Sequence, residues 1–219
     1  MADVGRCHPG DVLRWKEIEP ASEVRPLTDC VFCARLDQPP PLIETSRLYL
    51  MPDKFPLTPG HSLIISKQHL ACYGEADEET LDELETLLVE TRQFLGAAYG
   101  KPVIVWENGV SGQSVFHAHL HLIPMAVERL PIEFDGHPDV TTIADWSAVR
   151  QRYRRDGSYR YAQLGADRRL VAGHSPVMAG VGRLIAGATG LRRGPAGWIK
   201  TTTADDVADV GRRFSGWRG

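Results

Sequence analysis

Residues 113–124 read Gln-Ser-Val-Phe-His-Ala-His-Leu-His-Leu-Ile-Pro, so that three histidines alternate with apolar residues. This alternation is the period of a half-buried β-strand, whose successive side chains point to opposite faces. His117, His119 and His121 are therefore expected on one face, each about 7 Å from the next. Imidazole titrates near neutrality, binds metals and can act as a nucleophile. This strand is predicted to carry the chemistry of the protein.

The composition is that of an ordinary globular protein. A chain of 219 residues, 42% hydrophobic and 24% charged, can form one sizeable core or one domain with a smaller appendage. No apolar run reaches the roughly 20 residues of a membrane span, and Met1–Lys16 lacks the apolar segment of a secretory signal. Four cysteines are too few for a disulfide framework in a chain of this length. We expect a soluble, cytoplasmic protein with no membrane partner.

The pattern around the histidine strand predicts an α+β fold. Strands are expected over residues 43–51, 63–65 and 103–107. Residues 77–99 have the apolar spacing of a helix, with Asp77 as its N-cap and Gly100 as its end. We predict an antiparallel sheet of about five strands with this helix packed against it.

The chain after residue 130 is expected to form a smaller α/β extension. A hairpin is predicted over residues 159–171, a helix over residues 176–189, and a further helix that begins near residue 203. The predicted organisation is an irregular lead-in over residues 1–27, a main domain over residues 28–130, and a basic extension over residues 131–219.

The extension differs from the main domain in charge. Residues 150–219 contain 14 Lys/Arg and 5 Asp/Glu, a net charge of +9, whereas residues 1–149 carry −12. A basic segment can bind nucleic acid or phosphate-rich ligands. It can also dock on the acidic part of the same chain or simply form a solvated surface. The second interpretation is favoured, because the segment has apolar periodicity and lacks a dense run of arginines.

A pair of cysteines, Cys30-Val31-Phe32-Cys33, is compatible with a metal site, a redox pair or no special function. The redox interpretation is disfavoured, because the prolines that follow do not fit the strand-to-helix junction of a thioredoxin-like pair. Thiolates and imidazoles suit tetrahedral zinc, and the candidate histidines are His61, His69 and one of the three in the histidine strand. A catalytic zinc held by the three strand histidines is an alternative that leaves the cysteines unexplained. A closed site of Cys30, Cys33, His69 and His117 accounts for all the unusual residues. It leaves His119 and His121 for acid–base or nucleophilic work.

Three motifs in order resemble the histidine triad (HIT) superfamily of nucleotide hydrolases and transferases. Residues 113–124 resemble the family's His-φ-His-φ-His-φ-φ signature with its preceding Gln-Ser-Val. Residues 59–69 resemble its Pro-Gly-His strand, which ends in Lys-x-His, and residues 30–33 resemble its zinc-binding branch. The resemblance covers about residues 28–130. It implies a HIT-like catalytic domain there, followed by a C-terminal extension.

The resemblance implies a role for each site residue. His119 would attack the α-phosphate of a nucleotide and form a nucleotidyl-histidine, and His121 would hydrogen-bond the phosphoryl oxygens. Gln113 and Ser114 would contact the phosphate or the leaving group, and Asp53 the ribose hydroxyls. Asn108 is a weaker candidate for substrate binding, because it precedes His117 by nine residues where many members have eleven. The implied structural zinc has the ligands Cys30, Cys33, His69 and His117.

The predicted function is hydrolysis or transfer of a nucleotidyl group at the α-phosphate. The substrate would be a nucleoside phosphoramidate, a dinucleoside polyphosphate or a related nucleotide, with adenine or another purine as base. Family members commonly form homodimers, so a dimer is expected. The alternative is a non-catalytic, zinc-stabilised module that binds nucleotides or nucleic acid; nucleic acid is the less favoured partner.

Overall fold

A computed structural model describes residues 30–35, 38–130, 132–175, 177, 192–194, 197–199 and 202–218. The lead-in predicted over residues 1–27 lies outside the described residues. The helix predicted over residues 176–189 also lies outside them, apart from residue 177.

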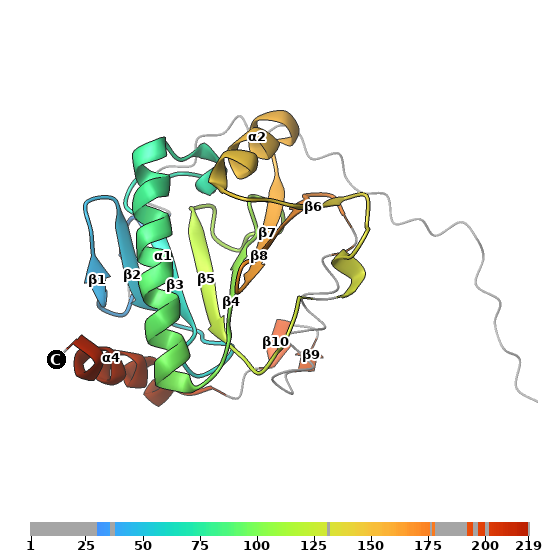
Figure 1. Cartoon of the computed structure of the whole chain (residues 1–219). Helices are drawn as coiled ribbons and strands as arrows, with labels where there is room; N and C mark the ends of the chain where they lie inside the picture. The colour runs from blue at the N-terminus through green and yellow to red at the C-terminus, as the bar shows by residue number, and fades with distance from the viewer. Residues whose placement is uncertain are drawn as a thin grey trace, which may run out of the picture.

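The centre of the fold is an eight-stranded antiparallel sheet in the order β1-β2-β3-β5-β4-β7-β8-β6. With the helices that pack on it, the sheet gives the predicted α+β class (Figure 1). The strands are β1 Ile43–Glu44, β2 Leu48–Pro52, β3 Ser62–Ser66, β4 Val103–Glu107, β5 His119–Pro124, β6 Val140–Thr142, β7 Tyr159–Leu164 and β8 Asp167–Ala172.

The prediction of about five strands was wrong, because the C-terminal hairpin extends the same sheet. β7 and β8 form the predicted hairpin, and Gly165 in its turn has a φ of +61°. β7 pairs along β4, from Ile104↔Leu164 to Glu107↔Tyr161. Without β7, β4 would present a row of unpaired backbone groups at the edge of the sheet. The hairpin satisfies these groups.

Two predicted helices are confirmed, and one helix was not predicted. α1 (Glu78–Tyr99) begins after Asp77, whose carboxylate accepts the Thr80 backbone N–H, and ends at Gly100 in the left-handed conformation. α4 (Ala204–Arg218) begins as expected near residue 203. The sequence predictions lack α2 (Trp146–Asp156), which follows the N-cap Asp145 and buries Trp146 and Val149.

Short elements complete the described structure. Two 3-10 helices, η2 (Tyr73–Glu75) and η3 (Ile132–Phe134), lie outside the sheet. β9 (Arg192–Gly194) and β10 (Gly197–Ile199) form a separate two-stranded sheet. No helix within the described ranges is long and apolar enough to cross a membrane.

The largest core lies between the sheet and the helices. α1 runs across one face of the sheet, as Figure 1 shows, and α2 and α4 lie at opposite ends of the molecule. Leu84, Leu88 and Phe94 of α1 are fully buried in this core with Leu120 of β5. Phe214 of α4 packs against Phe94, with 5.1 Å between the ring centroids. Burial on this face fixes which side of each strand points away from α1.

The opposite face of the sheet carries two smaller apolar clusters. One lies towards β2 and β3 and contains Met51, Leu63 and Ile65, with Phe32 packed against it. The other lies on β4, β5 and β7 and extends to η3. Its buried members include Trp106, Ile123, Phe134 and Ala162. The histidines of β5 belong to this face.

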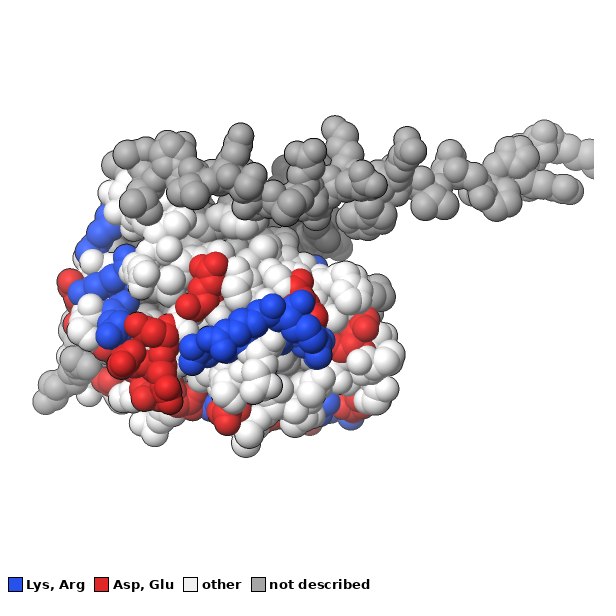
Figure 2. Space-filling view, turned by 90° about the horizontal axis from the view of Figure 1, so that it is seen from above, with Lys and Arg blue, Asp and Glu red and all other residues white. Residues whose placement is uncertain are grey.

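Arginines of the C-terminal segment pair extensively with acidic side chains. Arg168 contacts Glu85 of α1, and Arg213 lies 2.6 Å from Asp209. Arg152 lies 3.2 Å from Asp156. Figure 2 shows the same mixture on one face, where red side chains lie directly beside blue ones. Arg168 joins the basic segment to α1, whereas Arg152 and Arg213 pair with acidic residues of the segment itself.

A buried carboxylate links β4 to η2 and β7. Glu107 accepts hydrogen bonds from the backbone N–H of Tyr73 (2.8 Å) and the hydroxyl of Tyr159 (2.5 Å). The Tyr159 hydroxyl in turn accepts the backbone N–H of Gly74 at 3.0 Å. Burial raises the pKa of Glu107 to about 7, although both hydrogen bonds oppose the shift.

Glu107 should make the stability of the protein depend on pH. Its pKa is higher in the folded than in the unfolded chain, so its contribution is full below about pH 4.5 and is lost as the pH rises through about 7. Relative to Glu107→Gln, the wild type should lose about 2 kcal/mol of unfolding free energy between pH 5 and pH 8. Urea unfolding at both pH values measures this loss. The exposed Glu79→Gln is the matched control, and parallel curves for wild type and Glu107→Gln would contradict the assignment.

Candidate active site and metal centre

The three histidines of the motif do not all lie in one strand. β5 begins at His119, and residues 113–118 precede it. The predicted single strand over residues 113–124 was therefore wrong in its first half. The strand starts later than predicted because the chain turns at residues 115–117, where the backbone N–H of His117 donates to the carbonyl of Val115 at 3.0 Å. The turn directs His117 to a different site from that of His119 and His121.

His117 lies in a cluster with Cys30, Cys33 and His69. The His117 Nδ1 atom is 3.4 Å from Cys30 Sγ, 3.5 Å from Cys33 Sγ and 3.3 Å from His69 Nδ1. Cys33 Sγ lies 3.2 Å from His69 Nδ1. All four ligand atoms lie within 4.8 Å of one another. The structure therefore brings together the four residues predicted to hold a metal.

The cluster fits tetrahedral zinc. Zn–S bonds of about 2.3 Å and Zn–N bonds of about 2.0–2.1 Å place neighbouring ligand atoms about 3.3–3.8 Å apart. The ring orientation of His117 also fits, since its Nε2 lies 2.7 Å from the carbonyl oxygen of Ser66. A proton on Nε2 donates to this carbonyl and leaves the lone pair of Nδ1 directed at the cysteines.

His119 is held in one orientation by its own strand. Its Nδ1 lies 2.6 Å from the backbone carbonyl oxygen of His117, so Nδ1 carries the proton and donates it. The other ring nitrogen, Nε2, then holds a lone pair. The ring is 4% exposed, and the ring of Phe32 contacts it edge-on at a centroid distance of 5.4 Å. This is the geometry of a neutral imidazole with a single reactive nitrogen.

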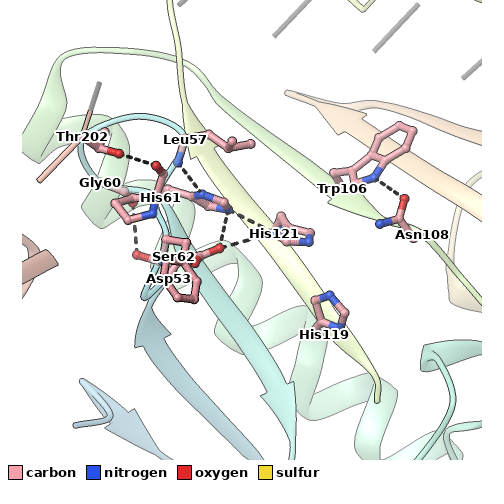
Figure 3. Close-up of polar contacts among 12 residues, drawn as sticks. Asp53, Leu57, Gly60, His61, Ser62, Trp106, Asn108, His119, His121 and Thr202 are labelled. Atoms are coloured by element: carbon pink, nitrogen blue, oxygen red, sulfur yellow. Dashed lines mark hydrogen bonds and ion pairs between the residues drawn. The ribbon is translucent and has the colours of Figure 1, made fainter. Parts of the chain in front are cut away.

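His121 is oriented by a chain of hydrogen bonds that starts at a backbone amide. The N–H of Leu57 donates to His61 Nδ1 at 3.0 Å, so the proton of His61 is on Nε2. His61 Nε2 lies 3.0 Å from His121 Nδ1, as Figure 3 shows. His121 Nδ1 therefore accepts, and its own proton is placed on Nε2. A donor at His121 then stands beside an acceptor at His119, with 5.0 Å between the ring centroids.

Asp53 lies against the same histidines. Its Oδ2 is 3.4 Å from His61 Nε2 and 3.9 Å from His121 Nδ1, and its Oδ1 accepts the backbone N–H of Phe55 at 2.6 Å. Residues Asp53, His61 and His121 also form a second group with metal-ligand atoms within 4.8 Å. The carboxylate therefore lies beside the two nitrogens of the His61–His121 contact and is closer to the one assigned as the donor, His61 Nε2.

Burial keeps two of the motif histidines neutral. Burial lowers the pKa of His119 to about 4, and the neighbouring His121 lowers it further, against the opposing effect of the His117 carbonyl. Burial likewise lowers the pKa of His117 to about 4. Neutral imidazole is the form that binds a metal or attacks phosphorus.

The remaining predicted residues differ in their contacts. Asn108 follows β4, and its Oδ1 accepts the indole N–H of Trp106 at 3.0 Å (Figure 3). Gln113 donates to the carbonyl of Ala71 at 2.9 Å, while its Oε1 is buried with no hydrogen-bond partner within the described structure. Ser114 is exposed, and the described contacts do not bring it against the histidines.

Sequence reasoning missed the part that His61 plays. His61 was considered there as a zinc ligand and received no role beside His121, whereas its Nε2 lies 3.0 Å from His121 Nδ1. The signal was present in the Pro-Gly-His motif, but the pairing requires the register of β3 and β5, in which Leu63 lies opposite His121. Phe32, between the two cysteines, was also missed, because its ring contact with His119 joins residues far apart in the chain.

The chain was compared with known proteins. Residues 41–127 match the family described as HIT domain. An uncharacterised HIT-like protein of Mycoplasma pneumoniae is 32% identical over 103 residues, which cover 44% of this chain and 71% of the relative. An adenylylsulfatase of Arabidopsis thaliana is 30% identical over 102 residues, which cover 44% of this chain and 52% of the relative.

The chain was also compared with solved structures. A hypothetical histidine triad nucleotide-binding protein of Sulfolobus tokodaii has 31% sequence identity and a TM-score of 0.41, over 49% of this chain and 76% of that one. The family match includes β2 to β5 and the three histidines described above. On the sequence match to the family and to the HIT-like protein of Mycoplasma pneumoniae, the chain belongs to the HIT domain family.

Proposed function

We propose that this protein transfers or hydrolyses nucleotidyl groups through His119. The observation that carries the proposal is the 2.6 Å hydrogen bond from His119 Nδ1 to the His117 carbonyl, because it fixes Nε2 as the nucleophilic atom. His121 Nε2–H is the donor for the phosphoryl oxygens. The two side chains then supply a nucleophile and an electrostatic stabiliser from one strand.

The reaction would proceed in two displacements. In the first, His119 Nε2 forms a bond to the α-phosphorus while the bond from phosphorus to the leaving group breaks and its electron pair leaves with that group. In the second, water or another acceptor attacks the nucleotidyl-histidine, releases the imidazole and loses a proton. The acceptor decides between hydrolysis and transfer.

The surroundings of His119 support a nucleotide as substrate. Phe32 packs against the apolar cluster that contains Leu63 and Ile65, and its ring contacts His119 edge-on. We propose a purine there and retain Asp53 as the candidate for the ribose. Gln113, Ser114 and Asn108 remain candidates for the phosphate and leaving-group side. The name of the Arabidopsis relative makes adenylyl sulfate a substrate to test.

We further propose a structural zinc ion bound by Cys30, Cys33, His69 and His117. The distances and the orientation of His117 fit this metal, as shown above. When bound, zinc would supply structural stability, because it joins the cysteine turn at residues 30–33 to the ends of β3 and β5. The ligand set is closed, which is typical of structural rather than catalytic zinc.

The predicted organisation and location remain proposals. Residues 28–130 would form the catalytic domain and residues 131–219 a C-terminal extension that widens its sheet. We propose a cytoplasmic homodimer. A dimer of this chain must use a surface other than the edge of β4, because β7 pairs there within the same chain.

His119→Ala should abolish turnover. Without the nucleophile, kcat for a fluorogenic adenosine phosphoramidate, diadenosine tetraphosphate or adenylyl sulfate should fall by about 1,000-fold or more, since the covalent route is lost. The wild type should also form an acid-labile nucleotidyl-protein adduct, visible by intact mass in rapid quench. His137→Ala, a histidine remote from β5, is the control and should keep its activity.

The same assay separates the alternative function. Equal turnover by His119→Ala and wild type would exclude the nucleophile. No turnover of any substrate by the wild type, together with tight and salt-sensitive nucleic-acid binding, would instead support the non-catalytic binding module.

Removal of zinc should destabilise the protein. Purified protein should contain one zinc ion per chain by elemental analysis, and Cys33→Ser should contain much less. Cys72→Ala, a cysteine outside the cluster, should keep the metal. At free zinc 1,000 times its Kd, the stabilisation is about 4 kcal/mol, measured as the difference in unfolding free energy with and without chelator.

Chelation also tests a catalytic zinc. Loss of turnover with unchanged stability, and zinc retained by Cys33→Ser but lost in His121→Ala, would favour the three strand histidines as ligands. The closed site instead predicts that chelation lowers the stability of the protein, and that zinc is lost from Cys33→Ser but retained by His121→Ala.

A further inference from the structure

Arg160 is an arginine of the C-terminal hairpin that lies on the same face of the sheet as the histidines. Side chains alternate along β7, and its neighbours Tyr159 and Tyr161 are buried in the core beneath α1 and α2. Ala162, two residues on, is buried beside Trp106 on the opposite face. Arg160 therefore points to the face of Trp106 and His121.

Strand register places Arg160 in one row with the candidate nucleophile. Trp106 of β4 lies opposite His121 of β5 on one side and Ala162 of β7 on the other. Two residues further on, side-chain alternation puts His119 of β5 and Arg160 of β7 on this same face, and Asn108 follows the end of β4. The pairing of β7 continues there, since the Tyr159 N–H donates to the Gly109 carbonyl at 3.0 Å. Two strand spacings put the backbones of His119 and Arg160 about 10 Å apart.

The guanidinium of Arg160 is held in place by two carbonyl oxygens. Its Nη1 donates to Ser175 at 3.1 Å, and its Nε lies 3.5 Å from the carbonyl oxygen of Ser111. The Ser111 hydroxyl is in turn bonded to the Gly173 carbonyl at 2.6 Å. The long side chain is thus fixed between the loop after β4 and the segment after β8.

No negative charge balances this cation among the described residues. Arg160 is half-buried and has no carboxylate within ion-pair distance there, unlike Arg152, Arg168 and Arg213. Burial alone lowers its pKa, with no acidic neighbour to raise it. Three of its five N–H groups have no protein acceptor in the described structure. The guanidinium therefore keeps N–H groups that can donate to an anion.

The loop that contacts Arg160 is closely fitted to β7. Gly109 has a φ of +50°, and a Cβ at this position would lie 2.6 Å from the carbonyl oxygen of Tyr159. Val110 has a φ of +77°, which is costly for a β-branched residue. Such a loop persists only when its surroundings hold it. The hairpin therefore positions both the guanidinium and the loop that leads to Gln113.

We propose that Arg160 binds the negatively charged leaving group of the substrate, so that the protein prefers phosphoanhydrides and related mixed anhydrides to phosphoramidates with neutral amines. The inference rests on the function proposed above. Arg160 would pair with an oxygen beyond the α-phosphate and stabilise the charge that the departing group acquires as its bond to phosphorus breaks. Arg160 is then a specificity-determining residue supplied by the segment outside the family match.

The experiment compares leaving groups at constant nucleotidyl group. Wild type, Arg160→Met, Arg160→Lys and the control Arg155→Met are assayed with diadenosine tetraphosphate, adenylyl sulfate and an adenosine phosphoramidate of a neutral amine. Arg160→Met should lose about 10- to 100-fold in kcat/KM for the two anionic leaving groups and less than about 3-fold for the amine. Arg160→Lys should retain part of the preference, and Arg155→Met all of it.

Equal losses for all three substrates would show that Arg160 only supports the loop, and no loss would show that it does not meet the leaving group; either result overturns the inference. Thermal unfolding of each variant identifies loss of fold. Calorimetric binding of AMP and ATP in the His119→Ala background provides a readout without turnover. Arg160→Met should reduce affinity for ATP about 10-fold or more and leave AMP unchanged. Failure of the proposed function would instead appear as absent turnover in the wild type.

Discussion

The position of β5 between β3 and β4 is the constraint on which the site depends. Leu120 and Leu122 are fully buried beneath α1, and this burial fixes the register, because a slip of one residue would turn them to the other face. The same register sets His121 opposite Leu63 and Trp106. The energy that holds the histidines in place is thus the burial of the leucines between them.

His117 connects the candidate metal centre to the candidate nucleophile. Its imidazole faces Cys30, Cys33 and His69, while its backbone carbonyl accepts the proton of His119 Nδ1. A displacement of His117 would therefore disturb the tautomer of His119. This link gives a physical reason why the candidate metal ligand and the candidate nucleophile occupy neighbouring positions in one short motif.

The C-terminal segment is part of the sheet and of the site's surroundings. β7 covers the edge of β4, and Tyr159 closes a buried network with Glu107. Arginines such as Arg168 and Arg213 are neutralised by acidic partners. Arg160 lacks such a partner within the described residues and faces the histidines. The net positive charge of the segment therefore says less about its function than the position of this one arginine.

The sequence by itself determined α1 and the grouping of the candidate metal ligands. The apolar spacing of residues 77–99 and the caps Asp77 and Gly100 specified α1, and the residue types and motif order pointed to the cysteine–histidine cluster. Only the tertiary structure decided the turn at His117, the contact of His61 with His121 and the pairing of β7 with β4. These depend on strand register and on contacts between residues far apart in the chain, whereas propensity and periodicity act over neighbouring residues alone.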